Sequence, residues 1–132
     1  MEYALPLESF GTAFAEFRAY LAKAPAPVVF PIEVRTAAAD DTWLGTASGR
    51  PTVYLAVHRY VRDNVPEYFP AAERILRRHG GRPHWGKEHS LGASQLSALY
   101  PRFADFQAMR STVDPQGLFL NEHLRRLLVE EV

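Results

Sequence analysis

Apolar side chains recur at helical intervals in two stretches of the N-terminal half of the chain. The first stretch contains Phe10, Ala13, Phe14, Phe17, Tyr20 and Leu21. The second follows Pro66 and contains Tyr68, Phe69, Ala72, Ile75 and Leu76. This spacing lines one face of a helix with apolar groups, so we expect two amphipathic helices. Ser9 is expected to cap the first. Gly80 and Gly81 are expected to end the second, because glycine readily adopts the left-handed conformation at a helix C-terminus.

Three further segments, residues 2–5, 28–36 and 52–61, predict strands, the second and third being rich in β-branched and aromatic residues. Successive side chains of a strand point to opposite faces of a sheet. One face of the second segment therefore carries Phe30, Ile32 and Val34, which we expect to face the helices. Glu33 and Arg35 lie side by side on the opposite face.

The third segment repeats this alternation. One face carries Val53, Leu55 and Val57, and the other carries Tyr54, His58 and Tyr60. If the second and third segments pair, one face of the sheet presents a carboxylate, a guanidinium, an imidazole and phenols. Two interpretations remain open for this surface: a binding site, or an exposed sheet face with a surface ion pair.

The C-terminal part of the chain predicts short helices. Residues 94–100 and 102–113 are expected to be helical, and Phe103, Phe106 and Met109 are expected to point inward. Residues 114–117 predict a turn, and Asn121 is expected to cap a last helix. These elements predict an α+β fold in which helices pack on one face of an antiparallel sheet and a helical C-terminal segment follows. We expect residues 1–132 to form a single domain.

Composition and charge narrow the classes of function. Of the 132 residues, 47% are apolar and 23% are charged, which is typical of a globular chain. The formal net charge is zero, so the chain has no general attraction to nucleic acid, and we expect no nucleic-acid partner. His79, His84 and His89 recur every fifth residue and do not share one helical face, so we expect no metal site.

Cysteine is absent, which rules out a thiol nucleophile and disulfides in these residues. Its absence fits a reducing compartment, and we expect a cytoplasmic location. The N-terminal residues lack the basic and apolar regions of a signal peptide.

Residues 80–87, with the sequence Gly-Gly-Arg-Pro-His-Trp-Gly-Lys, form a second candidate for function. Irregular segments held by a rigid scaffold often carry binding groups, and Lys87 is suited to binding an oxygen substituent or stabilising negative charge. The alternative is a helix stop in which Trp85 fills the core.

Three motifs of the chain resemble the cap domain of the aldonolactone oxidase family. They are residues 32–35 with 39–44, residues 80–87, and residues 100–103 with 114–121. That family includes L-gulonolactone and D-arabinono-lactone oxidases, with alditol oxidases as relatives, and it belongs to the vanillyl-alcohol-oxidase type of flavoenzyme. The motifs occur in the family's order and span nearly the whole chain.

The resemblance implies an FAD-dependent oxidation in which hydride passes from a CH–OH carbon to the flavin. In such enzymes FAD is bound mainly by an N-terminal domain, which these 132 residues do not contain. We therefore expect the FAD-binding domain in cis or in trans, and a chain that is inactive alone. We also expect apolar area around Phe119, Leu124 and Leu128 to be uncovered, with self-association of the isolated chain.

The resemblance also implies roles for individual residues. Glu33, Arg35 and Lys87 are expected to act at the reacting centre, with Glu33 orienting substrate hydroxyls and the two cations stabilising negative charge. The expected substrate-binding residues are His58, Tyr60 and His84, and the expected cofactor-binding residues are Lys87 and Asn121. Tyr60, as a bulky pocket residue, favours a sugar-1,4-lactone over a linear polyol as the substrate.

Two alternatives remain beside this interpretation. One is a fragment of an alditol oxidase of the xylitol type. The other is a stand-alone module that binds a sugar acid or a protein without redox chemistry.

Overall fold

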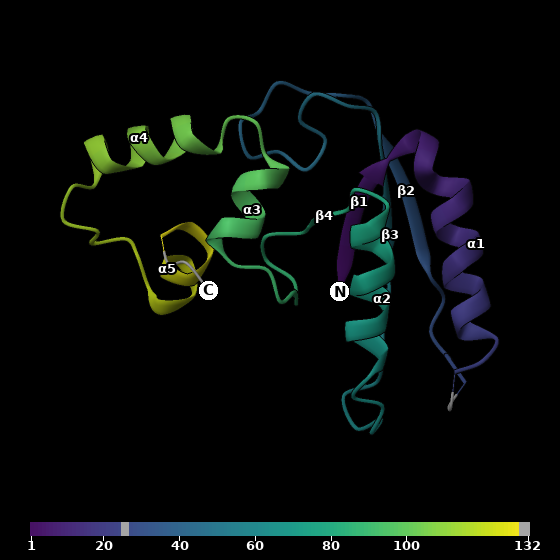
Figure 1. Ribbon diagram of the computed structural model, residues 1–132. Coiled ribbons are helices and arrows are strands. Elements are labelled where there is room, and N and C mark those ends of the chain that lie inside the picture. Colours follow the sequence, from purple (N-terminus) through teal and green to yellow (C-terminus); the bar gives the residue numbers. More distant parts are fainter. Residues whose placement is uncertain (25–26, 130–132) are drawn as a thin grey trace.

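The computed structural model describes residues 1–24 and 27–129. Its strands are β1 (Glu2–Pro6), β2 (Glu33–Ala37), β3 (Thr52–Ala56) and β4 (Arg82–Pro83). They form one antiparallel sheet in the order β2-β3-β1-β4. Helices α1 (Phe10–Leu21) and α2 (Tyr68–Arg78) cover one face of this sheet (Figure 1). The predicted α+β class is confirmed.

Beyond β4, the chain forms a helical segment of three short helices (Figure 1). They are α3 (Ala93–Leu99), α4 (Phe103–Val113) and α5 (Glu122–Leu128). Leu96 of α3 and Leu127 of α5 belong to the same buried cluster as Tyr3 and Leu55 of the sheet. One continuous core therefore joins the sheet layer to the C-terminal helices.

Both inner strands follow the two-residue alternation. Tyr3 and Leu5 of β1, with Val53 and Leu55 of β3, are buried under the helices. The opposite face of the sheet is not covered by α1 or α2, and it carries the polar side chains described below.

The second and third strands are shorter than expected. β2 begins at Glu33, and of the apolar residues of the expected strand Val28 and Ile32 pack against the core. Phe30 and Val34 are largely exposed, because β2 is the edge strand of the sheet. β3 ends at Ala56, where its pairing with Glu33 of β2 and Glu2 of β1 also ends.

Local details of the helices partly match the sequence-based expectations. Gly80 follows α2 with a φ of 73°, and the Asn121 side chain accepts a hydrogen bond from the Leu124 amide at 2.8 Å, as a helix cap does. Ser9 does not cap α1 through its side chain, because a 3-10 turn over Leu7–Ser9 runs directly into the helix. Met109 was expected to point inward but is 53% exposed.

The expected exposed surface near the C-terminus is partly corrected by the structure. Leu128 is buried and Leu124 packs against the core. Phe119 is exposed as expected, and so is its neighbour Leu118; both lie in the connection between α4 and α5. No helix within residues 1–24 and 27–129 is long and apolar enough to cross a membrane.

Candidate functional site

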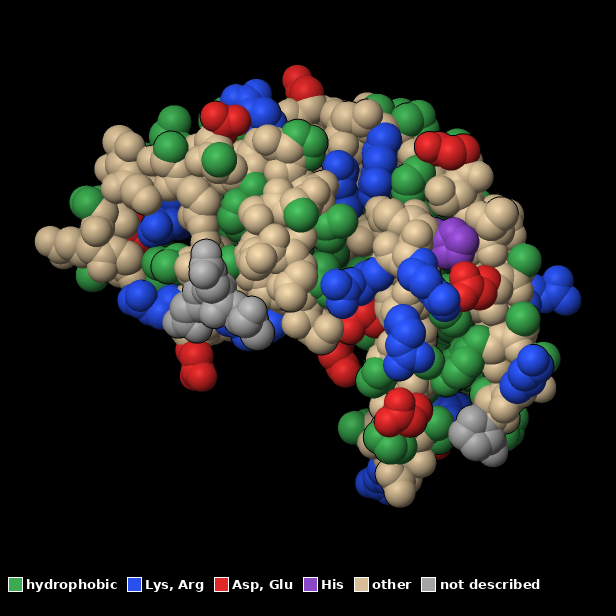
Figure 2. Space-filling view, in the orientation of Figure 1, with side chains coloured by type: hydrophobic (Ala, Val, Ile, Leu, Met, Phe, Trp, Pro, Cys, Tyr) green, Lys and Arg blue, Asp and Glu red, His purple; other side chains and the backbone are tan. Residues whose placement is uncertain are grey.

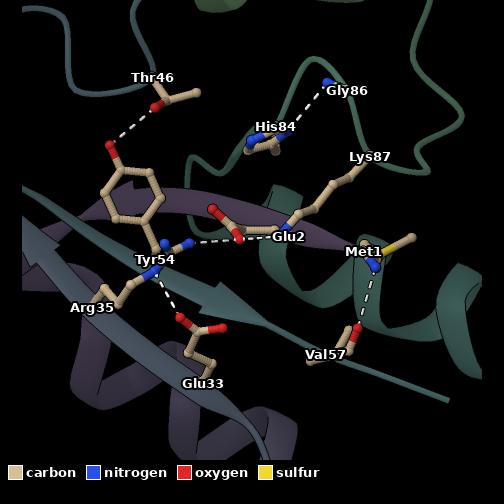
Figure 3. Close-up of polar contacts among 10 residues, drawn as sticks. All are labelled: Met1, Glu2, Glu33, Arg35, Thr46, Tyr54, Val57, His84, Gly86 and Lys87. Carbon is tan, nitrogen blue, oxygen red and sulfur yellow. Dashed lines mark hydrogen bonds and ion pairs between the residues drawn. The ribbon is translucent and has the colours of Figure 1, made fainter.

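A row of alternating charges crosses the uncovered face of the sheet (Figure 3). Glu33 and Arg35 of β2 form an ion pair, with 3.1 Å between Oε1 and Nε. Arg35 also donates through an Nη atom to Oε2 of Glu2 on β1 at 2.7 Å. The same Oε2 atom accepts from Nζ of Lys87, at 2.5 Å, from the loop after β4. Glu2 therefore links Arg35 and Lys87 through one oxygen atom.

The strand register explains how Arg35 reaches Glu2. Glu33 and Glu2 are both opposite Ala56 of β3, and Arg35 is opposite Tyr54. The short side chain of Ala56 leaves room on this face, so the Arg35 guanidinium can extend diagonally across β3. It lies 5.6 Å from the centre of the Tyr54 ring, within the range of a cation–π contact.

The electrostatics of this row keep Glu2 ionised. Its side chain is only 2% exposed, and burial alone raises the pKa of a carboxyl group. The hydrogen bond from Lys87 and the positive charges of Lys87 and Arg35 outweigh this effect, so the pKa of Glu2 lies below its usual range. Glu2 is therefore a carboxylate at neutral pH.

The segment that leads to Lys87 is held at two points. The Gly81 amide donates to the Leu76 carbonyl oxygen at the end of α2. The Trp85 indole donates to the Leu44 carbonyl at 2.9 Å, and its ring packs on Tyr100. Trp85 thus packs against the core, as the structural interpretation of residues 80–87 expects. Lys87 extends to the charged row, and its functional role stays a prediction.

A cleft of about 370 Å³ lies beside this row. It is lined by Glu2, Arg35, Thr36, Thr46, Tyr54 and His84. The Tyr54 and Thr46 hydroxyl oxygens are 3.0 Å apart and hydrogen-bonded, and Nδ1 of His84 accepts from the Gly86 amide. The cleft therefore offers hydroxyl groups, an imidazole and a guanidinium to a polar ligand.

A larger hollow, of about 520 Å³, lies on α2, where basic side chains gather (Figure 2). Arg74, Arg77 and Arg78 line it. The acidic residue of this hollow is Glu73, whose carboxylate already accepts hydrogen bonds from Tyr3 and Ser90. We take the smaller cleft as the candidate functional site, because it adjoins the row in which Arg35, Glu2 and Lys87 of three separate segments meet.

The structure brings together some of the residues expected at the site. Glu33, Arg35 and Lys87 share the charged row, and His84 lines the cleft. His58 and Tyr60 follow the end of β3 and are exposed; neither lines the cleft. Asn121 lies in the C-terminal helical segment, where its Oδ1 caps α5. The roles of all seven residues stay predictions.

Sequence reasoning missed Glu2 and Thr46 as members of the site. Glu2 alternates with the buried Tyr3, a signal that places it on the polar face once β1 is known to pair with β3. Thr46 lies in the loop before β3, and its sequence context carries no comparable signal. Within the described part of the chain, no group of three His, Asp or Glu side chains is placed to hold a metal ion.

Comparison with known proteins gives one family. The D-arabinono-1,4-lactone oxidase family matches residues 1–127. The chain is 44% identical over 128 residues to the L-gulono-1,4-lactone dehydrogenase of Mycobacterium tuberculosis, covering 97% of this chain and 30% of that protein. It is 35% identical over 131 residues to the L-gulonolactone oxidase of Bos taurus, covering 96% and 30%.

A Streptomyces alditol oxidase is 45% identical over 106 residues, covering 78% of this chain and 25% of that protein. The chain thus spans about 30% or less of the length of these relatives. Their names include both lactone and alditol substrates.

Proposed function

Because this chain belongs to the D-arabinono-1,4-lactone oxidase family, we propose that it is the substrate-binding portion of an FAD-dependent oxidoreductase. The proposed reaction is oxidation of a sugar-1,4-lactone by hydride transfer from a CH–OH carbon. The observation that supports it is the row Glu33–Arg35–Glu2–Lys87 on an open sheet face, beside a cleft lined with hydroxyl groups.

The donors of this face fit one part of FAD. Arg35 is 52% exposed and Lys87 is 36% exposed, so both can donate to carbonyl oxygens at the polar edge of a flavin ring. Neither the charged row nor the cleft contains a helix N-terminus or glycine-rich turn suited to a pyrophosphate. We therefore propose that the remaining contacts to FAD come from a flavin-binding part, in cis or in trans, and that this chain alone is inactive.

The residues of the cleft and of the neighbouring charged row suggest how a sugar is held. When FAD is bound, the flavin would accept the hydride from the CH–OH carbon, and the proton of the hydroxyl group would leave to solvent. Arg35 and Lys87 would stabilise the negative charge that develops on the substrate oxygen. Donors that are already held in place stabilise such charge most effectively, because they need not reorganise during the reaction. Oε1 of Glu33 forms an ion pair with Arg35. The second carboxylate oxygen of Glu33 would accept a hydrogen bond from a substrate hydroxyl group. The hydroxyls of Tyr54 and Thr46 would bind the distal part of the sugar.

The choice between a lactone and a linear polyol depends on the shape of the cleft. Tyr60 was expected to restrict the pocket, but Tyr54 is the aromatic residue that lines it. A rigid ring at this position favours a cyclic lactone over an extended alditol. Steady-state rates on L-gulono-1,4-lactone and xylitol test this proposal, and a clear preference for xylitol would identify an alditol oxidase.

Substitution of Arg35 tests the proposed site in the flavin-loaded enzyme that contains this chain. Arg35→Ala should lower kcat by about 10²–10³-fold while changing KM much less, because its charge is needed most in the transition state. Arg18→Ala, at an exposed position on α1, is the matched control and should retain normal turnover. Near-normal turnover in Arg35→Ala would show that this face of the sheet takes no part in the reaction.

A stand-alone binding module is the alternative function. Mixing the purified chain with the flavin-binding part of a relative distinguishes the two. Lactone oxidation should appear only in the mixture. Lactone binding by the chain, with no activity in the presence of a folded and flavin-loaded partner, would support the binding module instead.

A further inference from the structure

We propose that Glu2 is a positioning residue that fixes the spacing and orientation of Arg35 and Lys87. The inference rests on the proposed function, because it assigns Glu2 a task in the same site. Neither the family motifs nor the residues expected from the sequence include Glu2.

The first argument is connectivity. Arg35 lies on β2, Glu2 on β1 and Lys87 in the loop after β4, so three separate segments meet at one carboxylate oxygen. Two cations that converge on one site repel each other unless an anion lies between them. Glu2 Oε2 occupies that place, and it holds both cations within hydrogen-bonding distance.

The second argument is the gradient of burial across the cluster. The Glu2 side chain is almost completely buried, whereas about half of Arg35 and a third of Lys87 remain exposed. The two cations are therefore more accessible to solvent than Glu2, although Glu2 and Arg35 both form part of the cleft wall. This arrangement is typical of a supporting residue that orients the groups in front of it.

The third argument is the rigidity of Glu2 itself. Its backbone pairs with Ala56 in the centre of the sheet, and its carbonyl oxygen accepts from the His84 amide at 3.0 Å. That bond ties β1 directly to the loop that carries Lys87. A side chain fixed on the inner strand can therefore set the position of an edge strand and a loop relative to each other.

The test compares Glu2→Gln with Glu73→Gln in the flavin-loaded enzyme. Glu2→Gln keeps the size of the side chain but removes the charge that both cations share. We expect kcat to fall about 10- to 100-fold with a smaller change in KM, since small displacements of catalytic groups cost rates of this order. Glu73→Gln removes another buried carboxylate, one that bonds Tyr3 and Ser90 instead of exposed cations, and should leave kcat unchanged.

A second measurement does not require activity. In nuclear magnetic resonance spectra of the chain, the Arg35 Nη–H and Lys87 Nζ–H signals should be protected from exchange with water, because these groups donate to Glu2. Both should lose this protection in Glu2→Gln. Glu2→Asp, which keeps the charge on a shorter side chain, should restore part of the protection and part of kcat.

The outcomes separate this inference from the proposed function. If Arg35→Ala is impaired but Glu2→Gln turns over normally, Glu2 has no positioning role and the proposed site survives. If Arg35→Ala and Lys87→Ala both turn over normally, the proposed site fails as well. If Glu2→Gln does not fold, unprotected Arg35 and Lys87 signals in the wild-type chain would still overturn the inference.

Discussion

Glu73 shows how a buried carboxylate serves structure in this molecule. It lies on α2, where Oε1 accepts from the Tyr3 hydroxyl and, at 2.9 Å, from the Ser90 amide. Its Oε2 accepts from the Ser90 hydroxyl at 2.6 Å. These bonds join α2 to β1 and to the segment before α3. Glu73 differs from Glu2 in its partners, since none of the three donors is a cation.

The pKa of Glu73 predicts a stability that depends on pH. Burial raises this pKa, but the bonds from Ser90 and Tyr3 outweigh burial, so the pKa lies below its usual range. A carboxyl group with a lowered folded-state pKa stabilises the fold above its unfolded pKa, about 4.3. This stabilisation is lost as the pH falls through the folded-state value.

We therefore expect Glu73→Gln to lower the free energy of unfolding at pH 7 by about 1–3 kcal/mol. Its unfolding midpoint should also depend less on pH below about pH 4 than that of the wild type. Urea unfolding at pH 7 and across the acid range measures both effects. Glu8→Gln, at an exposed position, is the control. An acid dependence in Glu73→Gln equal to that of the wild type would contradict this account.

At the scale of elements, the junction between α2 and β4 determines where Lys87 lies. Gly81 approaches the end of α2 so closely that a Cβ atom there would be 2.6 Å from the Leu76 carbonyl oxygen. That oxygen also accepts the Gly81 amide. Any side chain at this position has to move the loop that leads to Trp85 and Lys87.

Gly81→Ala should therefore destabilise the fold by about 1–3 kcal/mol, as overpacking of a tight site does. Because the loop moves, kcat of the flavin-loaded enzyme should fall as well. Gly11→Ala on α1 is the matched control, since a Cβ atom there has no atom within 4 Å and alanine is the better helix former. Thermal unfolding and turnover of the two variants test the expectation. Equal stability of Gly81→Ala and the wild type would show that the junction relaxes without cost.

At the scale of the whole molecule, the charged row and the exposed apolar side chains lie in different parts of the structure. The row is on the sheet, whereas Leu118 and Phe119 lie between α4 and α5 in the C-terminal helical segment (Figure 1). Phe119 is 82% exposed. Exposed apolar groups of this kind often mark a contact with another chain or domain. If the proposed function holds, we expect this end to contact the flavin-binding part.

The isolated chain should consequently self-associate through this surface. The double variant Leu118→Ser, Phe119→Ser should reduce the weight-average mass measured by sedimentation or light scattering, because it removes the apolar contact. Val61→Ser, at another highly exposed apolar position, is the control and should not change the mass. A monomeric wild-type chain at high micromolar concentration would contradict the prediction.

Local patterns in the sequence predicted much of the fold and part of the site. Helical spacing placed α1 and α2, glycine marked the end of α2, and Asn121 marked the start of α5. The two-residue alternation put Glu33 and Arg35 on one face of β2. These properties depend on residues close in the chain, so a single sequence is enough to recognise them.

Other features depend on which segments meet in space. The order β2-β3-β1-β4 places Glu2 between Arg35 and Lys87, although Glu2 and Lys87 are separated by 85 positions in the chain. β3 extends only as far as β1 and β2 pair with it, and so it ends at Ala56. The alternation of side chains between the two faces therefore stops before His58 and Tyr60. Strand order, pairing length and burial arise from contacts between distant residues, so only the tertiary structure decided that a buried carboxylate joins the two cations of the site.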